Sequence, residues 1–411
     1  MSPRAHEPHH FAYIDAVRGY AFLGILFVHS AYSTGPFSWG FLAKQGEYGV
    51  QLFFLASAIT LCFSMSARQE GKMDFVNFYL RRLFRIAPLF WLSMVFYWTV
   101  PQVIPASWLG QWAPQGVHAS YFLLTTLFLH GWHPCTFNSI VPGGWSIAVE
   151  MTFYLVFPFC FHHITTLRRA ALCLLGGIVF TVIQQIIFLH LAPRLWPGVH
   201  ELHVTGFFLR LWFPAEFVYF LVGIFAYFLL KEPMVHQFYK SRFWSFWFLF
   251  MCAMSLWSSL HILGAIASLM VVMSLAGIVI SIAGNSVPLV VNPLICYLGK
   301  LSYSCYLTHF AALGIVLRLL HVVLRPYLLD PASDVLIAAN SQRNLAMFVL
   351  IAALTLILTV LFSIATHYLV ENPGIALGKT VIRRINQRRL SAEKAASREL
   401  PGLVAKSDDR L

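Results

Sequence analysis

Runs of eighteen or more mostly apolar residues recur along the whole 411-residue chain. A run of this length is long enough to cross a bilayer as a helix, and in lipid the helix pairs its own backbone polar groups. The composition agrees, because 59% of the residues are hydrophobic and only 11% are charged. The sequence therefore predicts an all-α, polytopic integral membrane bundle and excludes an ordinary soluble domain.

The apolar runs predict about ten spans, and the charges between them predict an orientation. Lysine and arginine are frequent in residues 67–82, in 231–242 and after 378, whereas residues 101–144 contain neither. The positive-inside rule therefore predicts that both termini are cytoplasmic. The predicted spans cover about residues 11–32, 48–66, 82–100, 145–163, 170–191, 212–230, 243–262, 264–283, 302–322 and 345–369.

The chain divides into a short cytoplasmic segment (residues 1–10), a transmembrane domain (11–377) and a basic cytoplasmic tail (378–411). For the tail, its basic and then mixed charge predicts a surface amphipathic helix followed by disorder. Within the connection 101–144, the apolar stretch 121–129 is too short to span and predicts an interfacial or re-entrant segment.

The net charge of +12 and the seven scattered cysteines exclude some partners. Because the positive charge is concentrated in loops and in the tail, we interpret it as a topology signal and expect no nucleic-acid binding. The cysteines form no C-x-x-C pair or other metal-ligand spacing, so neither a disulfide framework nor a metal site is predicted.

Three ionisable residues accompany the first span: Asp15, Arg18 and His29. On a helix, Arg18 and His29 lie within about 20° of one face and roughly 16 Å apart, and Asp15 falls about 40° to the other side of His29. Exposing such groups to lipid is costly. We therefore predict that the helix face they share points into the protein interior or into a water-filled cavity. The alternative is that Asp15 and Arg18 reach the headgroups and His29 is an ordinary core histidine.

A basic cluster, Arg81, Arg82 and Arg85, lies at the predicted cytoplasmic start of the third span. The i,i+3 and i,i+4 spacings place these side chains close together on a helix. Guanidinium groups bind phosphate in a planar, two-pronged way, so the cluster predicts a phosphorylated ligand. The alternative is a topology anchor beside anionic lipid, but Arg85 lies deeper in the apolar run than an anchor requires.

Glu150 lies in the first turns of a predicted membrane helix, one turn after Ser146. An acid at this depth must be paired, hydrogen-bonded or exposed to a cavity, so we favour a functional role for it. The alternative for the neighbouring Trp145 is that it is an ordinary anchor at the membrane–water interface.

Two polar groups follow in the last two predicted spans. Ser302, Tyr306 and His309 recur at i, i+4 and i+7, either as a substrate-binding face or as ordinary helix–helix hydrogen bonding. In the segment 368–373, Pro373 is predicted to end the last helix. Glu371 then lies at the cytoplasmic edge, where contact with basic residues is the simple alternative to function.

Taken in order, these blocks resemble the membrane-bound acyltransferase-3 family, which modifies hydroxyls of cell-surface glycans and of some small molecules. The resemblance covers roughly residues 11–375. The matching blocks are Asp-x-x-Arg-Gly with a later His (15–29), Arg-Arg-x-x-Arg-Ile-x-Pro (81–88), Trp-Ser-x-x-x-Glu (145–150), Ser-Tyr-x-x-Tyr-Leu-x-His (302–309) and Glu-x-Pro (371–373). The second span departs from the family pattern, with Gln51 in place of an acid and Ala58 in place of a glycine.

The resemblance implies a membrane O-acyltransferase in the bacterial cytoplasmic (inner) membrane. Its co-substrate would be acyl-CoA, most simply acetyl-CoA, with no tightly bound cofactor and no metal. Its partners would be membrane lipids and an acceptor hydroxyl on a polysaccharide, a lipid-linked glycan or a small molecule. The implied catalytic residues are His29, Arg18 and Glu150; the donor site is Arg82 and Arg85 with Arg81; the substrate-binding candidates are Asp15, Trp145, Ser146, Ser302, Tyr303, Tyr306 and His309.

Two mechanisms for His29 and two other classes of protein stay open. His29 is either a general base for the acceptor hydroxyl or a carrier that forms an acyl-histidine. A transporter or flippase would use the same buried charges without covalent chemistry, although no inverted repeat is visible. A haem protein would need facing histidine pairs at one depth, and the sequence offers no convincing set.

Overall fold

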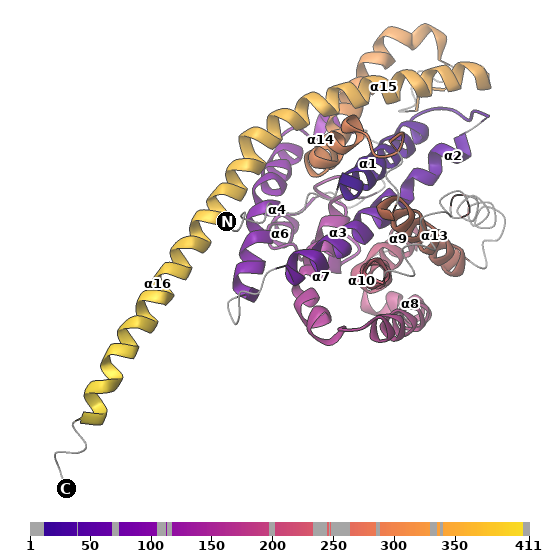
Figure 1. Ribbon diagram of the computed structural model, residues 1–411. Coiled ribbons are helices and arrows are strands. Elements are labelled where there is room, and N and C mark those ends of the chain that lie inside the picture. Colours follow the sequence, from indigo (N-terminus) through magenta and orange to yellow (C-terminus); the bar gives the residue numbers. More distant parts are fainter. Residues whose placement is uncertain are drawn as a thin grey trace.

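The computed structural model describes residues 12–38, 40–67, 74–104, 112, 117–196, 202–232, 245, 247, 264–284, 288–328, 335–337 and 340–405. In these ranges the structure is helical and has no β-strand; the isolated bridge between Thr34 and Leu336 is the β-type pairing found there. The predicted all-α fold is confirmed. Figure 1 shows the helices gathered into one bundle, from which the C-terminal helix extends as a long arm.

Seven stretches of the described chain are long and apolar enough to cross a membrane. Seven of the predicted spans correspond to these stretches. They are α1 (Ala12–Tyr32), Gly40–Ser66 with α2 (Gly40–Lys44), η1 (Gln45–Tyr48) and α3 (Gly49–Ser66), α7 (Gly144–His163), α8 (Leu167–Leu195), Val204–Lys231 with α9 (Leu202–Leu211) and α10 (Phe213–Lys231), α14 (Pro293–Leu324) and Ser341–Ala392.

The other three predicted spans have different outcomes. Residues 82–100 fall on α4 (Asp74–Thr99), and 264–283 fall on α13 (Gly264–Gly284). Residues 243–262 lie outside the described part, apart from 245 and 247. Large apolar side chains such as Leu175 and Leu189 of α8 are 60% and 64% exposed, as expected of a helix that faces lipid.

Helix α1 lies between α3 and α14 near the centre of the bundle (Figure 1). Two glycines permit the close approach on either side. A Cβ atom at Gly49 of α3 would lie 2.3 Å from the carbonyl oxygen of Ala21, and one at Gly299 of α14 would lie 1.8 Å from that of Asp15. Small residues at such crossings are typical of membrane helix packing. They place the polar residues of α1 within the protein and away from lipid.

The predicted end of the last helix at Pro373 is wrong. Helix α15 (Ser341–Thr366) continues through the π-helical turn η7 (His367–Glu371) into α16 (Asn372–Ala405). A π turn shifts the hydrogen-bond register, so Pro373 stands at the start of a new α-helical register, where a missing N–H is tolerated. The tail predicted over 378–411 is helical as far as Ala405, and residues 406–411 lie outside the described part.

In its described residues, the connection before α7 has short helices: η3 (Pro101–Val103), α6 (Ala119–Thr126) and η4 (His130–Trp132). The eight residues of α6 are too few to span, in agreement with the prediction for 121–129. His130 holds this connection to the start of α7, because its Nε2 lies 3.0 Å from the carbonyl oxygen of Gly144. Burial lowers the pKa of His130 to about 4, which keeps its ring neutral at physiological pH.

Candidate functional site

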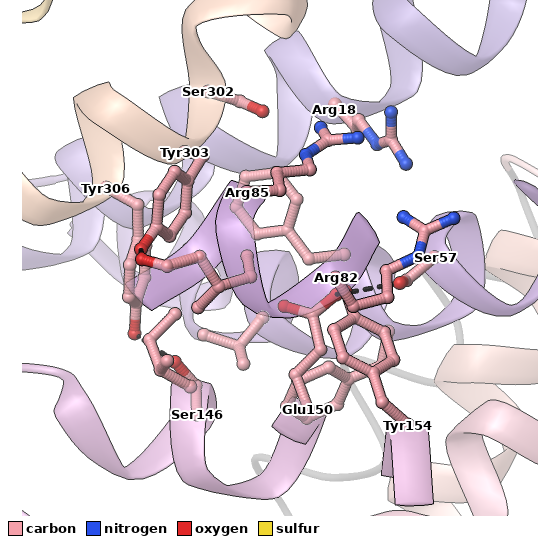
Figure 2. Close-up of a pocket in the computed structure, with 15 residues that line it drawn as sticks. Arg18, Ser57, Arg82, Arg85, Ser146, Glu150, Tyr154, Ser302, Tyr303 and Tyr306 are labelled. Atoms are coloured by element: carbon pink, nitrogen blue, oxygen red, sulfur yellow. Dashed lines mark hydrogen bonds between the residues drawn. The ribbon is translucent and has the colours of Figure 1, made fainter. Parts of the chain in front are cut away.

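A pocket lies between five helices, and its lining residues are up to 288 positions apart in the sequence (Figure 2). Charged, hydroxyl and aromatic side chains line it. The lining residues are Arg18 of α1; Val50, Phe53, Phe54 and Ser57 of α3; Arg82, Arg85 and Ile86 of α4; Ser146, Ile147, Glu150 and Tyr154 of α7; and Ser302, Tyr303 and Tyr306 of α14.

Three arginines make one side of the pocket strongly positive. Figure 2 shows the guanidinium groups of Arg18, Arg82 and Arg85 gathered there. Glu150 is the one acidic residue in the lining, and Asp15, outside the lining, is the other acid that acts on Arg18, so the three arginines outnumber the acids beside them. Within an apolar bundle, unbalanced charge is costly unless a counter-charge binds. The pocket therefore favours an anionic ligand.

Aromatic rings hold the Arg82 side chain in place. Its guanidinium carbon lies 5.8 Å from the ring centre of Phe78 and 5.6 Å from that of Tyr154. Such cation–π contacts position the charge while leaving its N–H donors available. The buried Nε of Arg82 has no hydrogen-bond partner in the described protein, and the Arg82 side chain is part of the pocket lining.

Glu150 is held by two hydroxyl groups. The Ser57 hydroxyl donates to Glu150 Oε1 at 2.7 Å, and the Tyr154 hydroxyl donates to the same oxygen at 2.5 Å. The two hydroxyl groups fix the position of this carboxyl group in the pocket. Neither donor was predicted from the sequence, although the i,i+4 spacing of Glu150 and Tyr154 was a signal that could have found the second.

A hydroxyl network closes the other side of the pocket. Ser146 Oγ lies 2.8 Å from the hydroxyl oxygen of Tyr306, which itself donates to the carbonyl oxygen of Gly143 at 3.0 Å. Gly143 precedes α7 in a left-handed conformation, with φ of 76°. The amide oxygen of Asn138 accepts from the Gly143 N–H at 2.9 Å and fixes this turn. The network places two hydroxyl groups opposite the arginines.

Tyr303 and Ser302 of α14 complete the lining. The Tyr303 hydroxyl donates to the carbonyl oxygen of Ile86 at 2.6 Å and joins α14 to α4. His309, predicted on the same face, does not line the pocket; it lies one turn beyond Tyr306, with 5.7 Å between the ring centres.

His29 lies with His309 and not with Arg18. The ring centres of the two histidines are 5.4 Å apart, and His29 is 4.5 Å from the ring of Phe310. Arg18 stands about 16 Å away along α1, on the side of the pocket where Arg82 and Arg85 lie. His29 therefore lies outside the pocket that Arg18 lines, at the distance along α1 that helix geometry predicts.

Eight of the predicted site residues meet in the pocket: Arg18, Arg82, Arg85, Glu150, Ser146, Ser302, Tyr303 and Tyr306. Five do not line it: Asp15, Arg81, Trp145 and the two histidines, His29 and His309. Trp145 contacts Phe54 edge-on, at 6.4 Å between ring centres. In the parts of the chain that the structure describes, no group of three or more His, Cys, Asp or Glu residues has the arrangement of a metal site.

The unusual Gln51 lies outside the pocket lining and faces a buried acid. Its Nε2 lies 3.1 Å from each carboxylate oxygen of Glu216, a residue of α10 that is 2% exposed. Glu216 is not among the residues predicted for the site, although an acid in an apolar run was a visible signal.

The arrangement combines an anion-binding side, a hydroxyl-lined side and a histidine pair beyond it. A family model described as an acyltransferase domain matches residues 11–367, a range that includes the whole pocket and both histidines. No curated protein and no solved structure matches the chain significantly. The family match covers most of the chain, and four of the five helices that carry the site (α1, α3, α7 and α14) belong to stretches long and apolar enough to span a membrane. The chain belongs to the membrane-bound acyltransferase-3 family.

Proposed function

We propose that this membrane acyltransferase moves an acyl group, most simply acetyl, from acyl-CoA to an acceptor hydroxyl. The acceptor class is a cell-surface polysaccharide, a lipid-linked glycan or a small molecule, and the membrane is the bacterial cytoplasmic membrane. The observation that carries the proposal is the cluster of Arg18, Arg82 and Arg85 in one pocket with a single acid. Coenzyme A carries several phosphate charges, and guanidinium groups are the side chains best suited to them.

The donor binds with its phosphates at the three arginines and its thioester toward Tyr306. This direction follows from the distribution of charge, because the hydroxyl network of Ser146 and Tyr306 is neutral. Arg18 then belongs to the donor site together with Arg82 and Arg85, since it lines the same side of the pocket. His29 and His309 lie beyond Tyr306, where the reactive end of an extended donor would point.

His29 acts on the acceptor hydroxyl as a general base. It takes the hydroxyl proton while the oxygen attacks the thioester carbonyl; the carbon–sulfur bond then breaks, and the proton passes to the leaving sulfur. General-base catalysis of this kind contributes about 10²–10⁴-fold. The alternative mechanism is covalent. A ring nitrogen of His29 attacks the thioester first, and the resulting acyl-histidine then transfers its acyl group to the hydroxyl.

The test is the affinity of purified protein for acetyl-CoA. Hydrogen bonds to charged groups contribute about 1.5–3 kcal/mol, so Arg82→Gln or Arg85→Gln should weaken binding about 10- to 100-fold. Lysine at either position should restore binding only in part, because an ammonium lacks the planar fork. Arg383→Gln, an exposed change of equal charge on α16, is the matched control and should leave the affinity unchanged.

The alternative is that Arg82 and Arg85 only anchor the helix at the membrane surface. Lysine would then be a full substitute, and glutamine would lower the abundance of the protein without changing donor affinity. If the double glutamine variant at matched abundance binds acetyl-CoA as the wild type does, in both low and high salt, the donor site is not in this pocket.

A further inference from the structure

The two histidines beyond the pocket come from different helices and are both enclosed by rings. His309 of α14 is 1% exposed and is surrounded by Phe22 at 6.3 Å, Phe310 at 4.2 Å, Tyr306 and His29, as distances between ring centres. A histidine in such surroundings has few groups to which it can donate or from which it can accept. The hydrogen bonds that His309 does make therefore determine which of its nitrogens carries the proton.

The backbone fixes the tautomer of His309. Its Nδ1 lies 2.6 Å from the carbonyl oxygen of Tyr306. A carbonyl oxygen can only accept, so Nδ1 carries the hydrogen, and in the neutral ring Nε2 is then a bare acceptor. Nε2 is buried and has no hydrogen-bond partner in the described protein. Leaving a buried acceptor without a donor is costly, which indicates a donor that joins it in the working state.

One of the four neighbouring rings can supply this donor. Phe22 and Phe310 have none, and the Tyr306 hydroxyl already donates to the carbonyl oxygen of Gly143. His29 remains, with its ring centre 5.4 Å from that of His309. Two imidazoles joined by an N–H···N bond of about 3 Å have their ring centres about 5–5.5 Å apart. The observed spacing is therefore that of a bonded pair, and a rotation of the His29 ring can direct an N–H toward Nε2 while the Nδ1 bond of His309 is kept.

We infer that His309 positions His29 by accepting a ring N–H of His29 on its bare Nε2. The inference rests on the proposed function, in which His29 is the base. With one nitrogen of His29 committed as a donor, the other nitrogen is bare and faces the acceptor hydroxyl. In a catalytic triad, a third group, usually a carboxylate, accepts a hydrogen bond from the base and orients it. His309 has this role toward His29, with a neutral imidazole in place of the carboxylate.

The proton is conserved through the step. When His29 takes the acceptor proton, the proton that it shares with His309 moves toward Nε2, and the positive charge is spread over both rings. The resulting His309 cation has both N–H groups bonded, one to the Tyr306 carbonyl and one to His29. When the thiolate leaves, the proton returns through His29 to the sulfur, and both rings are neutral again.

The first test does not depend on acyl transfer. Protein labelled with ¹⁵N-histidine is placed in lipid nanodiscs, and the imidazole signals are assigned with His29→Phe and His309→Phe variants. We expect a protonated Nδ1 and a hydrogen-bonded bare Nε2 on His309, with the Nε2 signal moving toward that of a free acceptor in His29→Phe. An Nε2 signal that does not move would overturn the inference.

Because a phenylalanine variant can fail to fold, the unmodified protein supplies a second measurement. A nitrogen–nitrogen coupling across the hydrogen bond between the two imidazoles is expected in the wild type. Signals of a protonated His309 Nε2 and a bare Nδ1 would contradict the tautomer on which the inference stands.

The second test is kinetic and uses acetyl-CoA with water as the acceptor, followed by thiol release. His309→Phe should lower kcat by about 10²-fold or more and shift the acidic limb of the pH profile, with KM for acetyl-CoA unchanged. His309→Gln should restore part of kcat, because its amide oxygen can accept the same N–H. Leu317→Ala, a buried change two turns further along α14, controls for loosened packing and should keep the wild-type pH profile.

The two tests separate failure of the inference from failure of the proposed function. If the wild type releases no thiol, the proposed reaction falls, and the nitrogen signals still decide the histidine pair. If His309→Phe turns over with the wild-type rate and pH profile, the positioning role falls and the reaction stands.

Discussion

At the scale of single residues, Glu150 sets the charge balance of the pocket. It is the one acid in the lining beside Arg18, Arg82 and Arg85. Glu150→Gln keeps an acceptor for Ser57 and removes the negative charge. We expect tighter binding of acetyl-CoA, by several-fold at low salt and less at high salt, because screening weakens the unbalanced attraction. Turnover should fall, since the neutral amide cannot orient a substrate as a carboxylate can.

The measurement is donor affinity and kcat on the same preparations at two salt concentrations. Glu232→Gln removes an exposed acid just after α10 and is the matched control, with no change expected in either quantity. Weaker donor binding in Glu150→Gln would instead mean that the carboxylate holds the arginines in place.

Which residues the sequence could identify depends on how unusual each is in an apolar run. Arginine and glutamate are costly in a membrane, so Arg85 and Glu150 were visible without a structure. Ser57 and Tyr154 were not, because hydroxyl side chains are ordinary in membrane helices and only their distances to Glu150 reveal them. The pairing of His29 with His309 also needed the structure, since their ring contact joins two helices that lie far apart in the sequence.

At the scale of elements, the turn before α7 joins the hydroxyl side of the pocket to the backbone. Gly143 has φ of 76°, and a Cβ atom there would lie 2.7 Å from the Tyr306 hydroxyl. Gly143→Ala should therefore lower the free energy of unfolding by about 1–3 kcal/mol and reduce turnover by displacing Tyr306. Thermal unfolding followed by tryptophan fluorescence measures the first effect, and thiol release from acetyl-CoA the second.

Gly176→Ala is the control for this change. Gly176 lies within α8, where a Cβ atom would have no neighbour within 4 Å. Alanine favours a helix over glycine, so the control should be neutral or slightly stabilising. A Gly143→Ala protein as stable as the wild type would show that the turn is not strained by a side chain.

The helices themselves were largely predictable from the sequence, whereas the joint between two of them was not. Hydropathy finds α1, α7 and α14 because each must bury or pair its whole backbone in lipid. Pro373 was expected to stop a helix, as it does in a regular α-helical ladder. The π turn η7 before it changes the register, and no local pattern in the sequence announces such a turn.

At the scale of the whole molecule, the structure fixes which chain segments share an end of the bundle. The Cys296 thiol lies 3.3 Å from the carbonyl oxygen of Ala12, so α1 and α14 begin at the same end. At the opposite end, the N–H of Leu336 donates to the Ser33 carbonyl at 3.0 Å. Val103 packs against Gly314 in the second half of α14. The connection 101–144 therefore leaves the bundle at the end opposite to Ala12.

The C-terminal helix returns to the first end. Gly374 and Gly378 of α16 pack against Phe84, in the first half of α4. Arg85, the next residue, lines the pocket together with Arg18 of the first turns of α1. The start of α1, the arginine side of the pocket and the start of α16 thus lie at one end of the bundle. Because residues 101–144 contain no lysine or arginine, the positive-inside rule predicts that this end is cytoplasmic.

Reporter fusions test this assignment. A phosphatase that is active only outside the cytoplasm, fused after residue 118, should be active, and the same phosphatase at the C-terminus should be inactive. A fluorescent protein that folds only in the cytoplasm should give the reverse pattern.

A fusion after residue 165, in the turn between α7 and α8 that precedes Arg168 and Arg169, is the control and should match the C-terminus. Equal readouts at residue 118 and the C-terminus would break the grouping. If the phosphatase is inactive at residue 118 and active at the C-terminus, the arginines lie outside the cytoplasm, away from the cell's acyl-CoA. The proposed donor site would then be wrong.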